Sequence, residues 1–441
     1  MDIKVTEETR IKDWTKKLRI FNKLHCYTNS YIICAPDLAA DKKAFNIKWA
    51  CFLTAALMAT ACTHKTPQVA ANTNTKNNGN EPKAWSASMQ DLKTSISNLL
   101  PIAASHESFE NPKNHQMIEE QLSVLSKEAS TIGKHATMAG RDPSVRYLSN
   151  AFTEDVKRIE TSFKVGKKEF ARYHVVNLTS YCIECHTRDS TGPNFGSEKL
   201  TSALQKLKPM ERAEYELATR QYDLALEELK KIISSNLDDK GNLFLVDKSM
   251  KLALAVTVKY QQSPDKALEV VSILEKSKNT PYFLKQNAVA WRASLESWKK
   301  EKVNTKDSVA AKLSRIEAKL AKASQMDSLT TDRSGDITYL RSLAELHTLL
   351  GGNLKKEEVG RTMYLIGVSY EAIRELEFLN LSENYFEGCI RTLPRTDWSS
   401  KCFKKYEESI YFGYSGSSGV QIPIDEQLKL KELQSLALPV Q

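Results

Sequence analysis

Glycine and proline are scarce in this chain of 441 residues, with 16 and 13 copies respectively. Both residue types interrupt helices and mark turns, so a sequence poor in them can sustain long helical segments. Runs of β-branched and aromatic residues typical of strands are few as well, whereas Ala, Leu, Glu, Lys and Ser dominate. The composition therefore predicts an all-α fold.

The chain also lacks a basic stretch interleaved with aromatic residues, although its formal net charge is +9. Proteins that bind nucleic acids usually concentrate positive charge on one face or along one helix, so we expect no nucleic-acid partner. There is no HExxH motif and no Ser-His-Asp set at a recognisable spacing. A small-residue loop, FGYSGSSGVQIP, does not follow a strand, which argues against a phosphate-binding loop.

An apolar run at residues 49–61 is too short to span a bilayer and follows several lysines, as the central region of a signal peptide does. The sequence LMATAC at its end resembles a bacterial lipobox, which implies that Cys62 is the lipidated N-terminus of the mature protein. We expect residues 1–61 to be an N-terminal extension plus signal peptide, and residues 62–83, rich in Asn and Thr, to be a flexible tether. The alternative is a buried core segment that ends in a cysteine.

Apolar residues then recur at helical spacing in four consecutive segments. The pattern predicts helices over residues 85–100, 118–132, 143–165 and 170–185. Pro101 is expected to end the first helix, and the fourth is expected to bury Phe170, Tyr173, Val176 and Tyr181 as one continuous stripe. Four amphipathic helices with short or moderate connections predict an up-and-down bundle.

The fourth segment ends in Cys182-Ile183-Glu184-Cys185-His186. Two cysteines one helical turn apart can bond to the two vinyl groups of one haem, and the histidine that follows can ligate its iron. A redox-active dithiol usually sits at a helix N-terminus after a strand, whereas this pair closes a helix. A structural zinc site would need further ligands. The motif favours one covalent haem c, with the dithiol and zinc as alternatives.

Residues 84–197, with FARYHVVNLTSYCIECHTR as their last helix, resemble the cytochrome c′ (class II cytochrome c) family. The resemblance implies that Cys182 and Cys185 form the thioethers and that His186 is the proximal iron ligand. Met89 or Leu92 on the first helix is implied on the distal side. Met89 as sixth ligand would favour electron transfer, whereas Leu92 would leave the iron open to a small gas. A class I cytochrome c, suggested by Gly-Pro after the motif, is the alternative fold.

The remaining chain continues in helical stripes, which predict a helical-repeat domain over residues 198–378. The segment ERAEYELATRQYDLALEELKKII resembles a tetratricopeptide unit, with Ala225 at a contact position, and SPDKALEVVSILEKS repeats the pattern around Ala267. Such repeats imply a protein partner. His347 is interpreted as an ordinary helix histidine.

Residues 379–441 are expected to form a C-terminal helical segment. Cys389 and Cys402 are the two cysteines left after the signal peptide, the lipid site and the haem motif are assigned. In an exported protein we expect them to form a disulfide, with two buried thiols as the alternative.

Together these features predict an exported c-type cytochrome on the periplasmic side of a bacterial cell envelope, anchored to the membrane by lipid at Cys62. We expect an electron carrier or gas-binding protein rather than an enzyme, with a redox partner protein or a small gas as its partner. A second hypothesis is an envelope scaffold in which the haem is a sensor or structural element. A haem peroxidase would need distal acid–base groups, and His106, His115 and His135 show no telling spacing for that role.

Overall fold

The computed structural model describes residues 81–136, 142–186, 202–238, 242–301, 307–329, 333–373, 381–417 and 419–438. These ranges are almost entirely helical, which confirms the predicted all-α class. Their only strands are β1 (Ser415–Gly416) and β2 (Gly419–Val420), a two-residue antiparallel pair. No helix in these ranges has both the length and the apolar character needed to cross a membrane.

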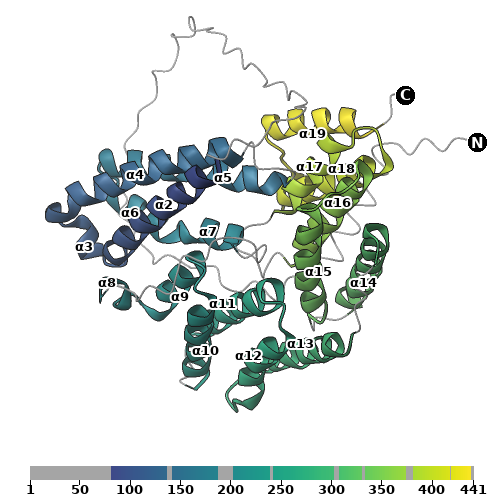
Figure 1. The fold of residues 1–441 in the computed structure, drawn as a ribbon, viewed down its shortest axis with the longest axis horizontal. Coiled ribbons are helices and arrows are strands. Elements are labelled where there is room, and N and C mark those ends of the chain that lie inside the picture. The colour runs from purple at the N-terminus through teal and green to yellow at the C-terminus, as the bar shows by residue number, and fades with distance from the viewer. Residues whose placement is uncertain are drawn as a thin grey trace, which may run out of the picture. The chain divides into compact units, whose positions relative to one another are not determined.

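The first helices pack around one apolar core and are called here the N-terminal helix group (Figure 1). They are α2 (Glu81–Ala103), α3 (His106–Glu110), α4 (Pro112–Ala136), α5 (Pro143–Lys164), α6 (Lys168–Asn177) and α7 (Thr179–His186). Residues of the predicted stripes, such as Leu99, Leu122 and Val156, are fully buried in this core. Asp142 caps α5: its carboxylate accepts a hydrogen bond from the Ser144 N–H (3.0 Å).

The end of the first helix differs from the prediction. The helix α2 continues through Pro101 to Ala103 instead of stopping at the proline. Leu99, Leu100 and Ala103 are all buried, so the apolar face extends past Pro101 and packing maintains the last turn. Tertiary contacts therefore outweigh the single backbone hydrogen bond that a proline removes.

The predicted fourth helix is wrong in its continuity, because the segment divides at Leu178 into α6 and α7. Side chains near the break hydrogen-bond to backbone carbonyls: Asn177 to Tyr173 (2.9 Å), Thr179 to Val176 (3.2 Å) and Ser180 to Asn177 (2.7 Å). Such local bonds compete with regular helical pairing and favour a break.

The buried face of α6 also differs from the prediction. Phe170 and Tyr173 are exposed, whereas Ala171 and Val175 are fully buried. The small Ala171 side chain lets the backbone approach the core, and the neighbouring Arg172 Nη1 donates to the Ala103 carbonyl (2.9 Å). The spacing of apolar residues alone does not distinguish the face with Phe170 and Tyr173 from the neighbouring face with Ala171 and Val175.

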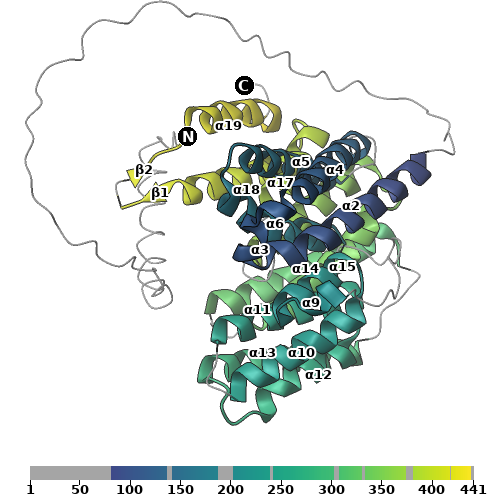
Figure 2. The same cartoon turned by 90° about the vertical axis from the view of Figure 1, so that its left-hand side faces the viewer.

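Helices of the second half pack mainly against their sequence neighbours, as Figure 2 shows for α12 and α13. In order they are α8 (Ser202–Gln205), α9 (Pro209–Ala218), α10 (Tyr222–Asp238), α11 (Leu243–Leu254), the π-helix η1 (Ala255–Tyr260), α12 (Pro264–Lys276), α13 (Tyr282–Lys300), α14 (Val309–Leu329), α15 (Gly335–Leu350), α16 (Lys356–Ala372), α17 (Ser382–Thr392), α18 (Asp397–Gly413) and α19 (Ile424–Ala437). Ala225 and Ala267, the residues aligned between the two repeat-like segments, are both fully buried.

The two halves share contacts and belong to one compact unit, Lys76–Gln441. Leu148 of α5 and Ile183 of α7 lie in the same apolar core as the second half. The Ser144 hydroxyl, in the first turn of α5, is 2.7 Å from the Tyr385 hydroxyl of α17. The region that carries the Cys-x-x-Cys-His motif is therefore packed directly against the C-terminal helices.

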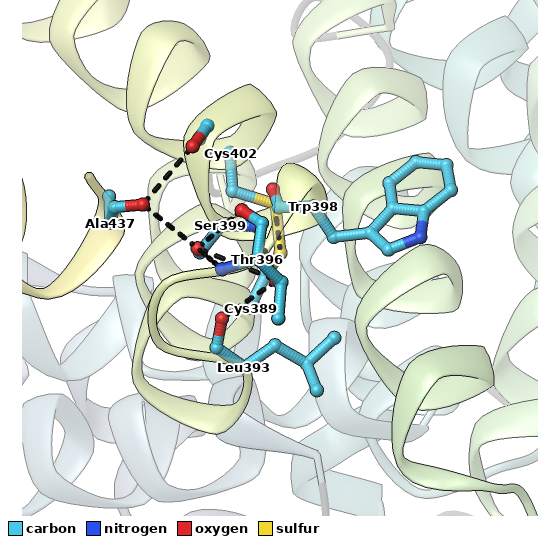
Figure 3. Close-up of a disulfide and its surroundings, with 8 residues drawn as sticks. Cys389, Leu393, Thr396, Trp398, Ser399, Cys402 and Ala437 are labelled. Carbon is cyan, nitrogen blue, oxygen red and sulfur yellow. Dashed lines mark hydrogen bonds between the residues drawn. A yellow bond between two sulfur atoms is a disulfide. The ribbon is translucent and has the colours of Figure 1, made fainter. Parts of the chain in front are cut away.

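Cys389 of α17 and Cys402 of α18 form a disulfide (Figure 3). Thr396 caps α18 by accepting from the Ser399 N–H (3.2 Å). The hydroxyl of Ser399 also lies within hydrogen-bonding distance of the Ala437 carbonyl at the end of α19 (3.2 Å). The disulfide and these hydrogen bonds together join the last three helices.

Candidate functional site

An apolar cavity lies between α2, α4, α5 and α7 and the turn after α9. The space free of atoms measures about 1160 Å³, open solvent included. Most of its wall is apolar, and its lining residues are Met89, Leu92, Lys93, Ile96, Ile132, Val145, Leu148, Ser149, Phe152, Tyr181, Cys182, Cys185, His186, Ala218, Thr219 and Arg220. The structure thus brings both thiols and the imidazole of the motif into one cavity with Met89 and Leu92.

The helix α7 is fixed to α5 by Tyr181, the residue before Cys182. The Tyr181 hydroxyl donates to Asp155 Oδ2 (2.6 Å), and its ring packs edge-on against Phe152 with centroids 5.8 Å apart. Burial and the hydrogen bond to Asp155 raise the pKa of the Tyr181 hydroxyl well above its usual range. Both contacts orient α7 so that its cysteines line the cavity.

Cys182 and Cys185 are not joined by a disulfide. Burial, assisted by the neighbouring Cys185, raises the pKa of the Cys182 thiol to about 12. Cys182 therefore stays a neutral thiol at neutral pH, with Sγ 3.8 Å from the Leu178 carbonyl. A redox-active dithiol needs a lowered thiol pKa, so this environment argues against the dithiol alternative.

His186 is held in one orientation. Its Nδ1 lies 2.7 Å from the Ala218 carbonyl, a geometry in which Nδ1–H donates and Nε2 carries the lone pair. Its own carbonyl accepts from the Tyr222 hydroxyl (2.7 Å). Burial and the nearby Arg220 charge lower the pKa of His186 to about 4, so the ring is neutral at pH 7. A neutral imidazole oriented by a backbone carbonyl is the form that binds metal ions.

Arg220 is a lining residue that the sequence did not single out. It follows α9 with a left-handed backbone conformation (φ 62°). Its Nε and Nη1 atoms are buried and have no hydrogen-bond acceptor among the described residues. Buried N–H groups that lack an acceptor are unfavourable in an apolar setting. The cavity therefore suits a ligand that carries an acidic group.

The residues that line this cavity give little support to a zinc site or a peroxidase. Within the described residues, the one group of three side chains spaced to hold a metal ion is His106, Glu110 and Glu169, which does not include the motif. Glu169 there already pairs with Arg172. Among the described side chains that line the cavity, His186 is the only histidine.

Two further charged residues near the motif were also missed. Glu184, between the two cysteines, is fully buried, as is Lys259 of η1, and Lys259 Nζ lies 3.9 Å from Glu184 Oε1. The sequence does contain one signal for Lys259, which is a single charge within the apolar run LALAVTVKY. His347, interpreted as an ordinary helix histidine, lies near the same pair. Its Nε2 is 3.2 Å from the hydroxyl of Tyr370, which contacts both charged side chains.

Comparison of the chain with protein-family models, curated proteins and solved structures finds no match. Cys62, the predicted signal peptide and the residues just after His186 lie outside the described residues.

Proposed function

We propose that this protein is a c-type cytochrome that binds one covalent haem in the cavity described above and transfers an electron or binds a small gas. The observation that carries the proposal is the convergence of Cys182, Cys185 and His186 on one apolar cavity that Met89 and Leu92 also line.

The side chains present fit such a group. Each cysteine thiol can add across a vinyl double bond of the porphyrin to form a thioether, and the neutral His186 can donate its Nε2 lone pair to the iron. Apolar residues of α2 and α5 would exclude water from the ring, and Arg220 would offer an N–H donor to its acidic substituents. The bound haem supplies one-electron redox chemistry or an iron site for a gas.

The packing of α2, α4, α5 and α6 around one core is compatible with a cytochrome c′-like bundle, and we include that fold in the proposal. The motif follows the break at Leu178, so the attachment helix is the short α7 rather than the end of one long helix. A short helix fixed by Tyr181 still presents the two cysteines one turn apart.

The direct test is to express the full chain in a bacterium that matures c-type cytochromes and to record its absorption spectrum before and after denaturation. We expect the haem spectrum to remain with the unfolded polypeptide, because thioethers survive denaturation. A Cys182→Ala/Cys185→Ala variant should lose the covalent haem, whereas a Cys389→Ala/Cys402→Ala variant, matched in chemistry, should retain it. A wild-type chain without covalent haem would refute the proposal.

The sixth coordination position can be assigned with Met89→Ala. If Met89 ligates the iron, the wild type has a low-spin spectrum that the variant converts to high-spin. If Leu92 covers an open site, the wild type is already high-spin, its spectrum shifts with carbon monoxide, and Met89→Ala changes little. Met210→Ala is the matched control, because Met210 is also partly buried but does not line the cavity.

The proposal includes export, a lipid anchor at Cys62 and docking of a partner protein on the helical hairpins. Exposed aromatic residues at the start of α13, Tyr282 (78% exposed) and Phe283 (55%), support a protein contact there. Mass analysis of the mature N-terminus tests the anchor. If the protein is instead a scaffold, Cys182→Ala/Cys185→Ala should still capture its partner from the envelope, whereas an electron carrier of this kind should lose its redox activity.

A further inference from the structure

A completely buried charged pair joins the Cys-x-x-Cys-His motif to η1. The side chains of Glu184 and Lys259 are both 0% exposed, and Lys259 Nζ is 3.9 Å from Glu184 Oε1. The Tyr370 hydroxyl joins them, lying 3.3 Å from Glu184 Oε1 and 3.4 Å from Lys259 Nζ. Lys259 Nζ also lies over the Tyr370 ring, 5.3 Å from its centroid. The carboxylate thus meets a cation and a hydroxyl that both come from the second half of the chain.

Removal of two charges from water costs several kcal/mol per ion, so a buried ion pair is seldom the most stable solution for a core. Replacement of a buried ion pair by apolar residues of similar volume is often neutral or stabilising. Stability alone therefore gives no reason for a carboxylate between Cys182 and Cys185. Its position within the attachment motif points to a role at the cofactor site.

The backbone that carries Lys259 is itself unusual. It belongs to the π-helix η1, in which the Gln261 N–H bonds to the Val256 carbonyl five residues earlier (2.8 Å). Such segments are rare, are unfavourable relative to regular helix, and occur often at functional sites. The wider turn changes the direction in which the following side chains project, and here Lys259 projects into the core toward Glu184.

We propose that Glu184 and Lys259 are positioning residues for the haem. Their contact fixes α7 to η1, and their charges tune the reduction potential of the iron. The inference rests on the proposed function. Ferric haem carries one more positive charge than ferrous haem, so a nearby negative charge favours the oxidised state and a nearby positive charge favours the reduced state. In the wild type the two buried charges largely offset one another.

The test is redox titration of the full-length haem protein, with ferricyanide as oxidant, dithionite as reductant and mediators for equilibration. Lys259→Met leaves the Glu184 carboxylate without its cation and should lower the midpoint potential. Glu184→Gln leaves the Lys259 ammonium without its anion and should raise it. The double variant removes both charges and should return toward the wild-type value. A purely structural role would shift both single variants in the same direction.

The matched control is Lys405→Met, because Lys405 pairs with Glu371 between two helices but does not line the cavity. Its midpoint potential should equal that of the wild type. Haem content per chain is measured first for every variant: a wild type without haem refutes the proposed function. If the wild type binds haem and the single variants shift together or not at all, the inference fails while the proposed function stands.

Discussion

The disulfide between Cys389 and Cys402 allows a quantitative prediction for the C-terminal helices. The bond joins residues 13 positions apart, so its reduction opens a loop of about 14 residues in the unfolded chain. On the chain-entropy model, closing such a loop lowers the entropy of the unfolded state enough to stabilise the fold by about 3 kcal/mol. We expect dithiothreitol to lower the free energy of unfolding by about this amount.

The loss of stability should come from the greater entropy of the reduced unfolded chain, because other contacts hold the folded helices in place. The turn between α17 and α18 is also held by the Thr396 cap and by hydrogen bonds from Ser399 and Ser400 to the Ala437 carbonyl (3.2 and 3.1 Å). Because these contacts do not depend on the disulfide, the native helices should persist after reduction. Reduction also leaves both sulfur atoms in place, so it creates no cavity.

Urea unfolding followed by circular dichroism at 222 nm, with and without reductant, measures the effect. The control is Cys389→Ala/Cys402→Ala, which should unfold at the same urea concentration in both conditions and lie below the oxidised wild type. Cys182→Ala/Cys185→Ala should keep the full response to reductant. Equal unfolding midpoints for the oxidised and reduced wild type would refute the reasoning.

Three other substitutions, one of them with a matched control, test the packing and electrostatics. Gly367→Ala should destabilise the fold by about 1–3 kcal/mol in urea unfolding, because its methyl group would overlap the Phe386 ring, whereas Gly413→Ala, with nothing within 4 Å, should have little effect. Leu99→Ala in the core of the N-terminal helix group should cost about 2–5 kcal/mol in the same assay. Burial raises the pKa of Glu216 to about 7, so the folded state binds more protons than the unfolded state between about pH 4.5 and 7. The free energy of unfolding should therefore fall as pH rises through this window. In Glu216→Gln the difference in the free energy of unfolding between pH 5 and pH 8 should be smaller than in the wild type.

Much of the local structure could be predicted from the sequence because apolar spacing reports which face of a helix is buried. The all-α class follows from this spacing, and several helices lie close to their predicted ranges. The break at Leu178 was missed because it depends on side-chain hydrogen bonds to backbone carbonyls. The exposure of Phe170 was missed because hydrophobicity alone ranked it above its small neighbour Ala171.

For the candidate site, local spacing singled out Cys182, Cys185 and His186, and an expected position on the first helix suggested Met89 and Leu92. The structure brings all five to one cavity. Arg220 could not be found this way, since it lies in a turn with no motif of its own. Lys259 meets Glu184 only through the tertiary fold, and a one-dimensional pattern carries no information on such pairs.

The contact between Ser144 and Tyr385 has a consequence for the order of events during synthesis. The two hydroxyls are separated by 241 residues, so the first turn of α5 acquires this partner only after most of the polypeptide has been made. Contacts so distant in sequence form late and slow folding. A nascent chain that ends before α17 therefore carries the complete Cys-x-x-Cys-His motif and every residue that lines the cavity, but not this contact between α5 and α17.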